Sequence, residues 1–157
     1  MAPLVHPDSS ILILGTMPGD KAIELQQYFA HRSNQFWKLL FAVFGEEFST
    51  DYAVRKMLLQ KNHIALWTVL ASCERSGSMD QNIRNEAPND INELLKAYPK
   101  IKHVFFESVA ARKYFSKHVE EMPEITYGIL PSPSSAFATM GFEQKLELWK
   151  ALRQIDK

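Results

Sequence analysis

Short apolar runs alternate along the chain with longer amphipathic stretches. Four of these runs are typical of buried strands, and they occupy residues 10–14, 64–70, 103–106 and 125–130. Apolar side chains at three- and four-residue spacing predict helices over residues 33–44, 51–61, 109–118 and 142–155. Asn89 or Asp90 is placed to cap a further helix that ends at Tyr98, before Pro99.

Residues 72–89 break the alternation. This stretch is polar and contains Gly77 and Pro88, so it is predicted to be a long surface loop. The remaining strands and helices alternate, and this order implies right-handed βαβ units and a parallel sheet covered on both faces. The fold class is therefore α/β, in one domain over residues 1–157.

Composition narrows the classes of function. Hydrophobic residues make up 46 %, charged residues 23 %, and the formal net charge is zero, which argues against nucleic-acid binding by bulk charge but leaves room for a local basic patch. The single cysteine, Cys73, cannot form an internal disulfide, a four-cysteine zinc site or an iron–sulfur cluster. No signal peptide and no apolar run long enough to span a membrane is visible, so we expect a cytoplasmic protein.

Three unusual turns follow predicted strands. They are GTMPG at residues 15–19, ESVA at 107–110 and PSPSS at 131–135. In open α/β sheets, ligands bind at the carboxyl ends of the strands, so the three turns should converge on one edge. Backbone N–H groups of GTMPG could contact a carbonyl oxygen of a flat ligand, and PSPSS could hold phosphate with its hydroxyl groups. Without further context, the pattern of each turn is more typical of a plain connection.

An aromatic and polar cluster lies between the first turn and the first predicted helix. Phe36 and Trp37 are expected in the core, whereas Phe29 could stack on a base or pack in the core. His31 and Arg32 could be exposed to solvent. Asn34 lies where asparagine commonly caps a helix, and a catalytic role is the alternative.

Together these segments resemble the uracil-DNA glycosylase superfamily, and most closely its deoxyinosine (hypoxanthine) DNA glycosylase branch. The similar stretches are "GTMPG … YFAHRSNQFWKLL", "IALWTVLASCERSGSMDQNIRNEAPNDI", "ILPSPSSAFA" and "GFEQKLELWKAL". The resemblance implies a three-layer α/β/α sandwich with a four-stranded parallel sheet. It also implies an enzyme of base excision repair that flips a deaminated base out of DNA and hydrolyses its N-glycosidic bond, without a metal or other cofactor. A monomer associated with the nucleoid is expected.

The resemblance assigns roles to individual residues. Uracil-specific branches hold the water-positioning side chain in or near the first turn, where this chain has Met17, which cannot orient water. The deoxyinosine branch places its catalytic asparagine in a segment that here contains Asn34. The expected base-binding residues are Gly15, Thr16, Met17, Pro18, Gly19, Phe29 and Glu107. The expected DNA-binding residues are His31, Arg32, Arg75, Ser132, Pro133, Ser134, Ser135 and Phe137.

Some positions depart from the branch. Asn-Gly usually follows the third strand, where this chain has Glu107-Ser108, and an ionised carboxylate would repel O6 of hypoxanthine or O4 of uracil. Either Glu107 is protonated, or it points away, or the substrate differs. Thr68 stands where the branch often has aspartate, and Ala136 is too small to act as an apolar wedge, which leaves Phe137 or Met140 for that role.

Two other functions fit the same residues. A relative that binds lesions without cleaving them is favoured by Glu107 and Thr68. An enzyme acting on small nucleosides is favoured by the zero net charge. Base release from DNA, salt-dependent DNA binding without base release, and turnover of free nucleosides would distinguish the three.

Overall fold

The computed structural model describes residues 1–155 and contains a four-stranded parallel sheet in the order β2-β1-β5-β6. Its strands are β1 (Ile11–Gly15), β2 (Ile64–Thr68), β5 (His103–Phe106) and β6 (Thr126–Ile129). The helices are α1 (Asp20–Leu25), α2 (Phe36–Val43), α3 (Tyr52–Lys61), α4 (Ile91–Ala97), α5 (Val109–His118) and α6 (Phe142–Trp149). The predicted four-stranded parallel sheet is confirmed.

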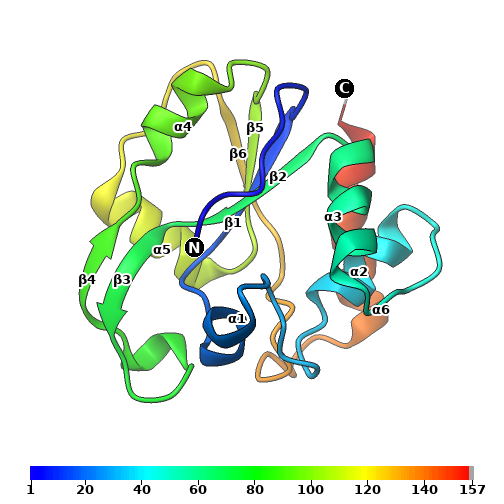
Figure 1. Ribbon diagram of the computed structural model, residues 1–157, viewed down its shortest axis with the longest axis horizontal. Coiled ribbons are helices and arrows are strands. Elements are labelled where there is room, and N and C mark those ends of the chain that lie inside the picture. Colours follow the sequence, from blue (N-terminus) through cyan, green and yellow to red (C-terminus); the bar gives the residue numbers. More distant parts are fainter. Residues whose placement is uncertain (156–157) are drawn as a thin grey trace.

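Strand β1 lies inside the sheet and divides the core into two layers. Ile11 and Ile13 pack against the cluster that contains α2, α3 and α6 side chains, whereas Leu12 and Leu14 pack against the cluster beneath α4 and α5. Alternate side chains of a strand point to opposite faces, so a strand buried on both faces reads as one continuous apolar run. Figure 1 shows α4 and α5 on one side of the sheet and α2, α3 and α6 on the other. The three-layer arrangement is confirmed.

Residues 72–89 do not form the predicted surface loop. Instead, β3 (Leu70–Glu74) and β4 (Arg84–Pro88) form a two-stranded antiparallel sheet, and a 3-10 turn, η1 (Asp80–Asn82), lies between them. Most of the side chains on both strands are exposed, and the pairing register shifts twice. Because neither strand buries an apolar face, the sequence carries no alternating pattern there to reveal them. We call residues 70–88 the β3–β4 hairpin.

Several boundaries also differ from the prediction. The run at residues 64–70 is split because β2 ends at Thr68 and Leu70 begins β3. The first amphipathic helix begins at Phe36, since residues 31–33 form a turn. The last helix changes after Trp149 into a 3-10 segment, η2 (Lys150–Gln154). Helix α1, six residues long, was not predicted.

Figure 1 shows α1, the connection leading to α2 and the connection between β6 and α6 gathered at the end of the sheet where β1 ends. No helix within residues 1–155 is long and apolar enough to cross a membrane.

Candidate active site

Gly15, the last residue of β1, lies at the centre of this sheet edge. A Cβ atom at this position would lie 3.3 Å from Phe29 Cζ, 3.5 Å from Thr68 Cγ2 and 3.8 Å from Glu107 Cγ. The first and second predicted turns and the aromatic segment therefore meet around one glycine. We call Gly15, Thr16, Phe29 and Glu107 the inner wall of the site.

Side chains of the β3–β4 hairpin form hydrogen bonds with the backbone of the first turn and of Asp20, the residue after it. Arg75 donates from Nη2 to the Pro18 carbonyl oxygen at 2.7 Å, and the Ser78 hydroxyl accepts from the Asp20 backbone N–H at 3.1 Å. The Arg75 side chain is only 5 % exposed, and its Nη1 lies 3.8 Å from Asp80 Oδ1. In the free protein, Arg75 thus holds the first turn in place, and its expected contact with DNA stays a prediction.

The other residues of the first turn are also held by packing. Pro18 is buried, and Met17 is half-buried against the core cluster beneath α4 and α5. Thr16 is buried, and its hydroxyl lacks a well-formed hydrogen bond, although it lies close enough to Asp80 to lower the pKa of that carboxyl. The turn is therefore a fixed backbone surface.

Phe29 is held in an unusual backbone conformation. Its φ of 52° lies in the left-handed region, which a bulky residue rarely adopts. Its ring stacks on Phe36 with centroids 4.0 Å apart and planes 8° from parallel. Trp37 Nε1 donates to the Tyr28 carbonyl oxygen at 2.8 Å, which fixes the adjacent peptide. Such local strain persists only where the surroundings enforce it, and it is often found at functional sites.

Asn34 is oriented by the start of α2. Its Oδ1 accepts from the Phe36 backbone N–H at 2.9 Å, and its own N–H donates to the His31 carbonyl oxygen at 2.9 Å. Asn34 thus lies one residue before the N-cap, Gln35, and binds the N–H of the first residue of α2. One bond to Oδ1 leaves a second lone pair free, so the same oxygen can accept from a water molecule.

The third turn lies beside the Asn34 segment. The Gln35 backbone N–H donates to the Pro133 carbonyl oxygen at 2.8 Å, and the Ser135 hydroxyl lies 3.4 Å from the Ser33 hydroxyl. From below, Trp149 Nε1 donates to the Pro131 carbonyl oxygen at 2.8 Å. The convergence of all three predicted turns on one edge is thus confirmed.

Lys145 is a part of this edge that sequence reasoning missed. It lies on the core-facing side of α6, is 2 % exposed, and donates from Nζ to Gln35 Oε1 at 3.0 Å and to the Ser134 carbonyl oxygen at 3.2 Å. Burial lowers the pKa of this ammonium group. The sequence could have indicated this burial. Lys145 follows Phe142 by three residues and precedes Trp149 by four, and residues at these spacings lie on the same face of a helix. Lys145 therefore joins the Asn34 segment to the third turn.

Other predicted residues lie at the outside of the edge. His31 and Arg32 are exposed, as are Ser135 and Phe137, whose ring is 36 % exposed and lies 5.4 Å from Lys145 Nζ. The His31 ring accepts through Nδ1 from the Ser33 N–H at 3.2 Å. We call His31, Arg32, Ser135 and Phe137 the rim. Between rim and core lie Ser132, half-buried, and Pro133, buried.

Glu107 is the titratable group of the inner wall. It is 7 % exposed, and burial together with the negative charge of Asp80 raises the pKa of its carboxyl to about 8, although hydrogen bonds from the Ser108 hydroxyl and the Thr16 backbone N–H act in the opposite direction. Burial also raises the pKa of Asp80, against the effects of the Thr16 hydroxyl and of Arg75.

Thr68 contributes only its methyl group to the inner wall. Its hydroxyl donates to the Leu70 carbonyl oxygen at 3.0 Å, and the Asn89 amide donates to the Thr68 carbonyl oxygen at 2.9 Å. These bonds stabilise the corner between β2 and β3.

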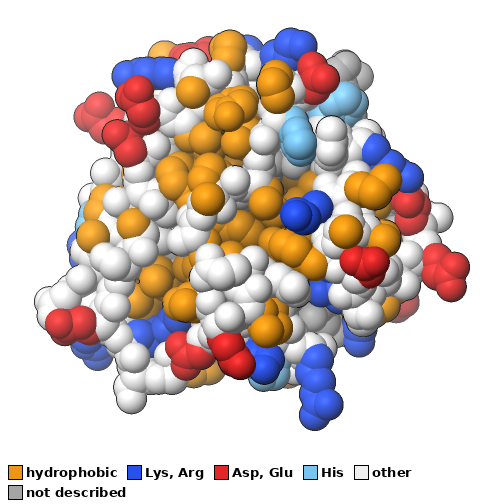
Figure 2. All heavy atoms as spheres, viewed as in Figure 1, with side chains coloured by type: hydrophobic (Ala, Val, Ile, Leu, Met, Phe, Trp, Pro, Cys, Tyr) orange, Lys and Arg blue, Asp and Glu red, His pale blue; other side chains and the backbone are white. Residues whose placement is uncertain are grey.

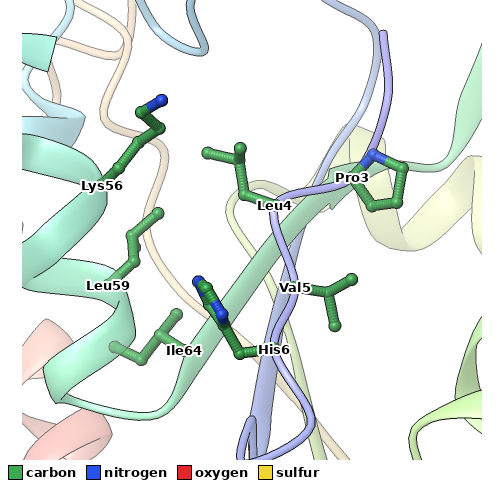
Figure 3. A pocket seen from close by; sticks show the side chains of 7 residues that line it. All are labelled: Pro3, Leu4, Val5, His6, Lys56, Leu59 and Ile64. Atoms are coloured by element: carbon green, nitrogen blue, oxygen red, sulfur yellow. The ribbon is translucent and has the colours of Figure 1, made fainter. Parts of the chain in front are cut away.

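A cavity of about 260 Å³ lies elsewhere, between the N-terminal segment and α3 beside the start of β2. Figure 3 shows its side chains, among which Leu4 and Leu59 are apolar and Lys56 is charged. It does not include any residue of the inner wall or the rim.

On the face shown in Figure 2, charged side chains of both signs surround an apolar area, so this face carries no patch of one charge. Residues 1–155 contain no cluster of three or more His, Cys, Asp or Glu side chains suited to a metal ion.

Comparison with known proteins identifies relatives over nearly the whole chain. The family model of the uracil DNA glycosylase superfamily matches residues 2–153. A hypoxanthine DNA glycosylase from Methanosarcina acetivorans is 34 % identical over 152 residues, which cover 95 % of this chain and 93 % of the relative. A second hypoxanthine DNA glycosylase, from Methanosarcina barkeri, is 36 % identical over 113 residues, or 71 % of this chain and 72 % of the relative.

A solved structure has the same fold. The solution NMR structure of a candidate uracil DNA glycosylase from Methanosarcina acetivorans superposes with a TM-score of 0.80 at 28 % identity, over 98 % of this chain and 96 % of that chain.

Proposed function

The chain belongs to the uracil DNA glycosylase superfamily, and from this premise we propose that it is a DNA glycosylase that removes hypoxanthine from DNA by hydrolysing the N-glycosidic bond. The observation that carries the proposal is the convergence of Phe29, Glu107 and the first turn on Gly15, next to a segment in which Asn34 is held in a fixed orientation. The relatives named as hypoxanthine DNA glycosylases support the choice of base.

In this proposal the inner wall receives the extrahelical base. Phe29 presents an aromatic ring stacked on Phe36, and the lack of a side chain at Gly15 lets this ring lie close to the end of β1. The backbone N–H groups of Met17 and Gly19 face the base, whereas Pro18 between them has no N–H to donate. As the glycosidic bond breaks, negative charge develops on the leaving base, and preorganised N–H donors stabilise it.

Asn34 positions the attacking water. The Phe36 N–H fixes the amide through one lone pair of Oδ1, and the second lone pair accepts from water and aligns it with the sugar carbon. A neutral amide is a poor base, so alignment and the electrostatic environment supply most of the rate. No proton needs to be transferred to Asn34 in the rate-limiting step, because the sugar already carries cationic character.

The rim holds the DNA around the flipped nucleotide. Arg32 and His31 are exposed and can contact phosphate, and the Ser132, Ser134 and Ser135 hydroxyl groups are placed on a turn that is anchored from below. Phe137 is the exposed apolar side chain best placed to enter the gap in the duplex. A protein with this activity works where DNA is, so we infer that it is associated with the nucleoid in the cytoplasm. We also propose that it acts as a monomer.

A base-release assay tests the proposal. Wild-type protein is incubated with oligonucleotides that carry hypoxanthine, uracil, xanthine or thymine opposite each ordinary base, and free base and alkali-labile sites are both measured. The Asn34→Ala variant, purified in the same way, controls for a contaminating glycosylase. We expect hypoxanthine to be released fastest, and only by the wild type. Folded protein that binds DNA but releases no base would instead identify a lesion-binding protein.

A further inference from the structure

The Glu107 carboxyl occupies a place where its charge state decides which base can bind. It follows β5 directly, its Cγ lies 3.8 Å from the position of a Gly15 Cβ, and it is almost fully buried. The Glu107 carboxyl is therefore shielded from bulk water and lies beside the end of β1. Hypoxanthine and uracil both offer a lactam edge, in which a carbonyl oxygen accepts next to a ring N–H that donates.

We propose that Glu107 is a specificity-determining residue that acts in its neutral form: its O–H donates to the base carbonyl oxygen while its C=O accepts from the neighbouring ring N–H. This inference rests on the proposed function and names the group that reads the base. An ionised carboxylate has two acceptors and no donor, so it would place negative charge against the lone pairs of the base oxygen.

A count of hydrogen-bonding capacity supports this pairing. The Thr16 backbone N–H and the Ser108 hydroxyl both donate to the Glu107 carboxyl. The Ser108 oxygen meanwhile accepts from the Ala111 N–H at 3.1 Å, which fixes the direction of its hydroxyl. A neutral carboxyl that accepts these two bonds keeps one donor and further acceptor capacity, which is what a lactam edge requires.

The surroundings explain why the proton stays on Glu107. The charged groups packed around it come from the β3–β4 hairpin: Asp80, whose negative charge disfavours a second carboxylate, and Arg75, whose Nη1 lies 3.8 Å from Asp80 Oδ1. Arg75 compensates Asp80, so Asp80 is the member of the pair that carries the charge. The facing groups from β1, β2 and the aromatic segment are Gly15, Thr68 and Phe29, and none of them is ionisable. Burial first, and the negative charge of Asp80 second, raise the pKa of Glu107 to about 8.

The experiment compares the wild type with Glu107→Gln, whose amide keeps one donor and one acceptor at every pH. Single-turnover release of hypoxanthine is measured for both proteins between about pH 6 and about pH 10. The base N–H itself titrates in alkali, so the quantity of interest is the ratio of the two rates at each pH. We expect this ratio to be constant below about pH 7 and to fall about tenfold per pH unit above the Glu107 pKa of about 8. Glu120→Gln, at an exposed position, is the surface control.

A measurement on the wild type alone guards against a variant that does not fold. With carbon-13 in the glutamate side-chain carboxyls, NMR should show one carboxyl titrating near pH 8, far above the ordinary value of 4.5. Base release with a rate ratio that does not change with pH would overturn the role of Glu107 but leave the proposed function intact. Completion of every glutamate titration below about pH 6 would also overturn it. No base release at any pH, with the late carboxyl present, would overturn the proposed function and the base-reading role with it.

Discussion

The inner wall and the rim of the site are held in different ways. Phe29, Thr16 and Glu107 are fixed by stacking, burial and backbone hydrogen bonds, and the β3–β4 hairpin closes the wall from behind. The rim residues His31, Arg32 and Ser135 are exposed, and the side-chain hydrogen bonds of His31 and Ser135 are to Ser33, which is itself exposed. A rigid, dry wall suits the recognition of one base edge, whereas exposed side chains suit contacts with a flexible DNA backbone.

Because of this difference, we expect changes in the inner wall to affect the rate of base release and changes at the rim to affect the affinity for DNA. Changes in the inner wall should reduce base release while DNA still binds, because the wall contacts only the flipped nucleotide. Changes at the rim should weaken DNA binding while the chemical step of bound DNA continues.

Among changes to the inner wall and the rim, the largest effect on activity is expected from filling the centre of the inner wall. In Gly15→Val, the new side chain would enter a space where even Cβ lies 3.3 Å from the Phe29 ring and 3.5 Å from the Thr68 methyl group. Displacement of the ring or of the base should lower single-turnover base release by about 100-fold or more. Gly141→Val is the matched control, because a Cβ at Gly141 meets no atom within 4 Å. Equal rates in the two variants would mean that Gly15 does not border the base.

A smaller effect is expected where the third turn is joined to the Asn34 segment. Lys145→Met removes the ammonium group that holds both Gln35 Oε1 and the Ser134 carbonyl oxygen. Loss of this link should shift the third turn relative to Asn34 and lower kcat/KM for DNA by about tenfold. Lys150→Met, on the next turn of the chain with a partly exposed side chain, should leave kcat/KM unchanged. If the two variants behave alike, the third turn does not depend on its anchor.

A change at the rim should have a still smaller effect, and on binding alone. Arg32→Ala removes an exposed positive charge, which should weaken DNA binding about threefold and reduce the slope of log Kd against log salt concentration by about one. The single-turnover rate at saturating enzyme should stay the same. Lys100→Ala provides the control, since Lys100 is exposed and precedes β5 at the opposite end of the sheet. An unchanged salt slope would exclude Arg32 from the phosphate contacts.

The last expected effect is on the stability of the folded protein. The folded protein holds a proton on Glu107 up to about pH 8, whereas the ordinary pKa of a glutamate is 4.5. The stability that this carboxyl contributes is therefore complete below about pH 4.5 and is lost as the pH rises through about 8. Glu107→Gln cannot ionise, so its melting temperature should fall less between about pH 6 and about pH 9 than that of the wild type, by about 5 °C or more. Parallel curves for the two proteins would show that Glu107 is not buried as described.

Much of this architecture was predictable because its signals are local. The central strand β1 is a continuous apolar run because both of its faces are buried. The start of α4 was predicted from Asp90 as a capping residue, and the Asp90 side chain does accept from the Glu93 N–H at 3.2 Å. The meeting of the three turns followed from the topology of parallel sheets. Helix α1 was not predicted, because six residues with one buried side chain give no periodic pattern.

The missing parts of the site depend on contacts between distant segments. The β3–β4 hairpin has mostly exposed strands, so nothing in its sequence shows that Arg75 lies under the first turn or that Asp80 approaches Glu107. The sequence left the state of Glu107 open among three alternatives. Burial and the neighbouring charge of Asp80 favour the protonated one, and both arise only when the hairpin packs against the first turn.

The most direct test of the account is the single-turnover rate of hypoxanthine release by Asn34→Ser, measured together with its affinity for DNA. Serine retains an oxygen that can cap the Phe36 N–H, so α2 should still form, but its short hydroxyl cannot hold the water that Asn34 is proposed to align. The account predicts a rate about 1,000-fold below that of the wild type, with a Kd for DNA within about twofold. A rate within about tenfold of the wild type, from folded protein at saturating concentration, would contradict the assignment of the chemistry to Asn34.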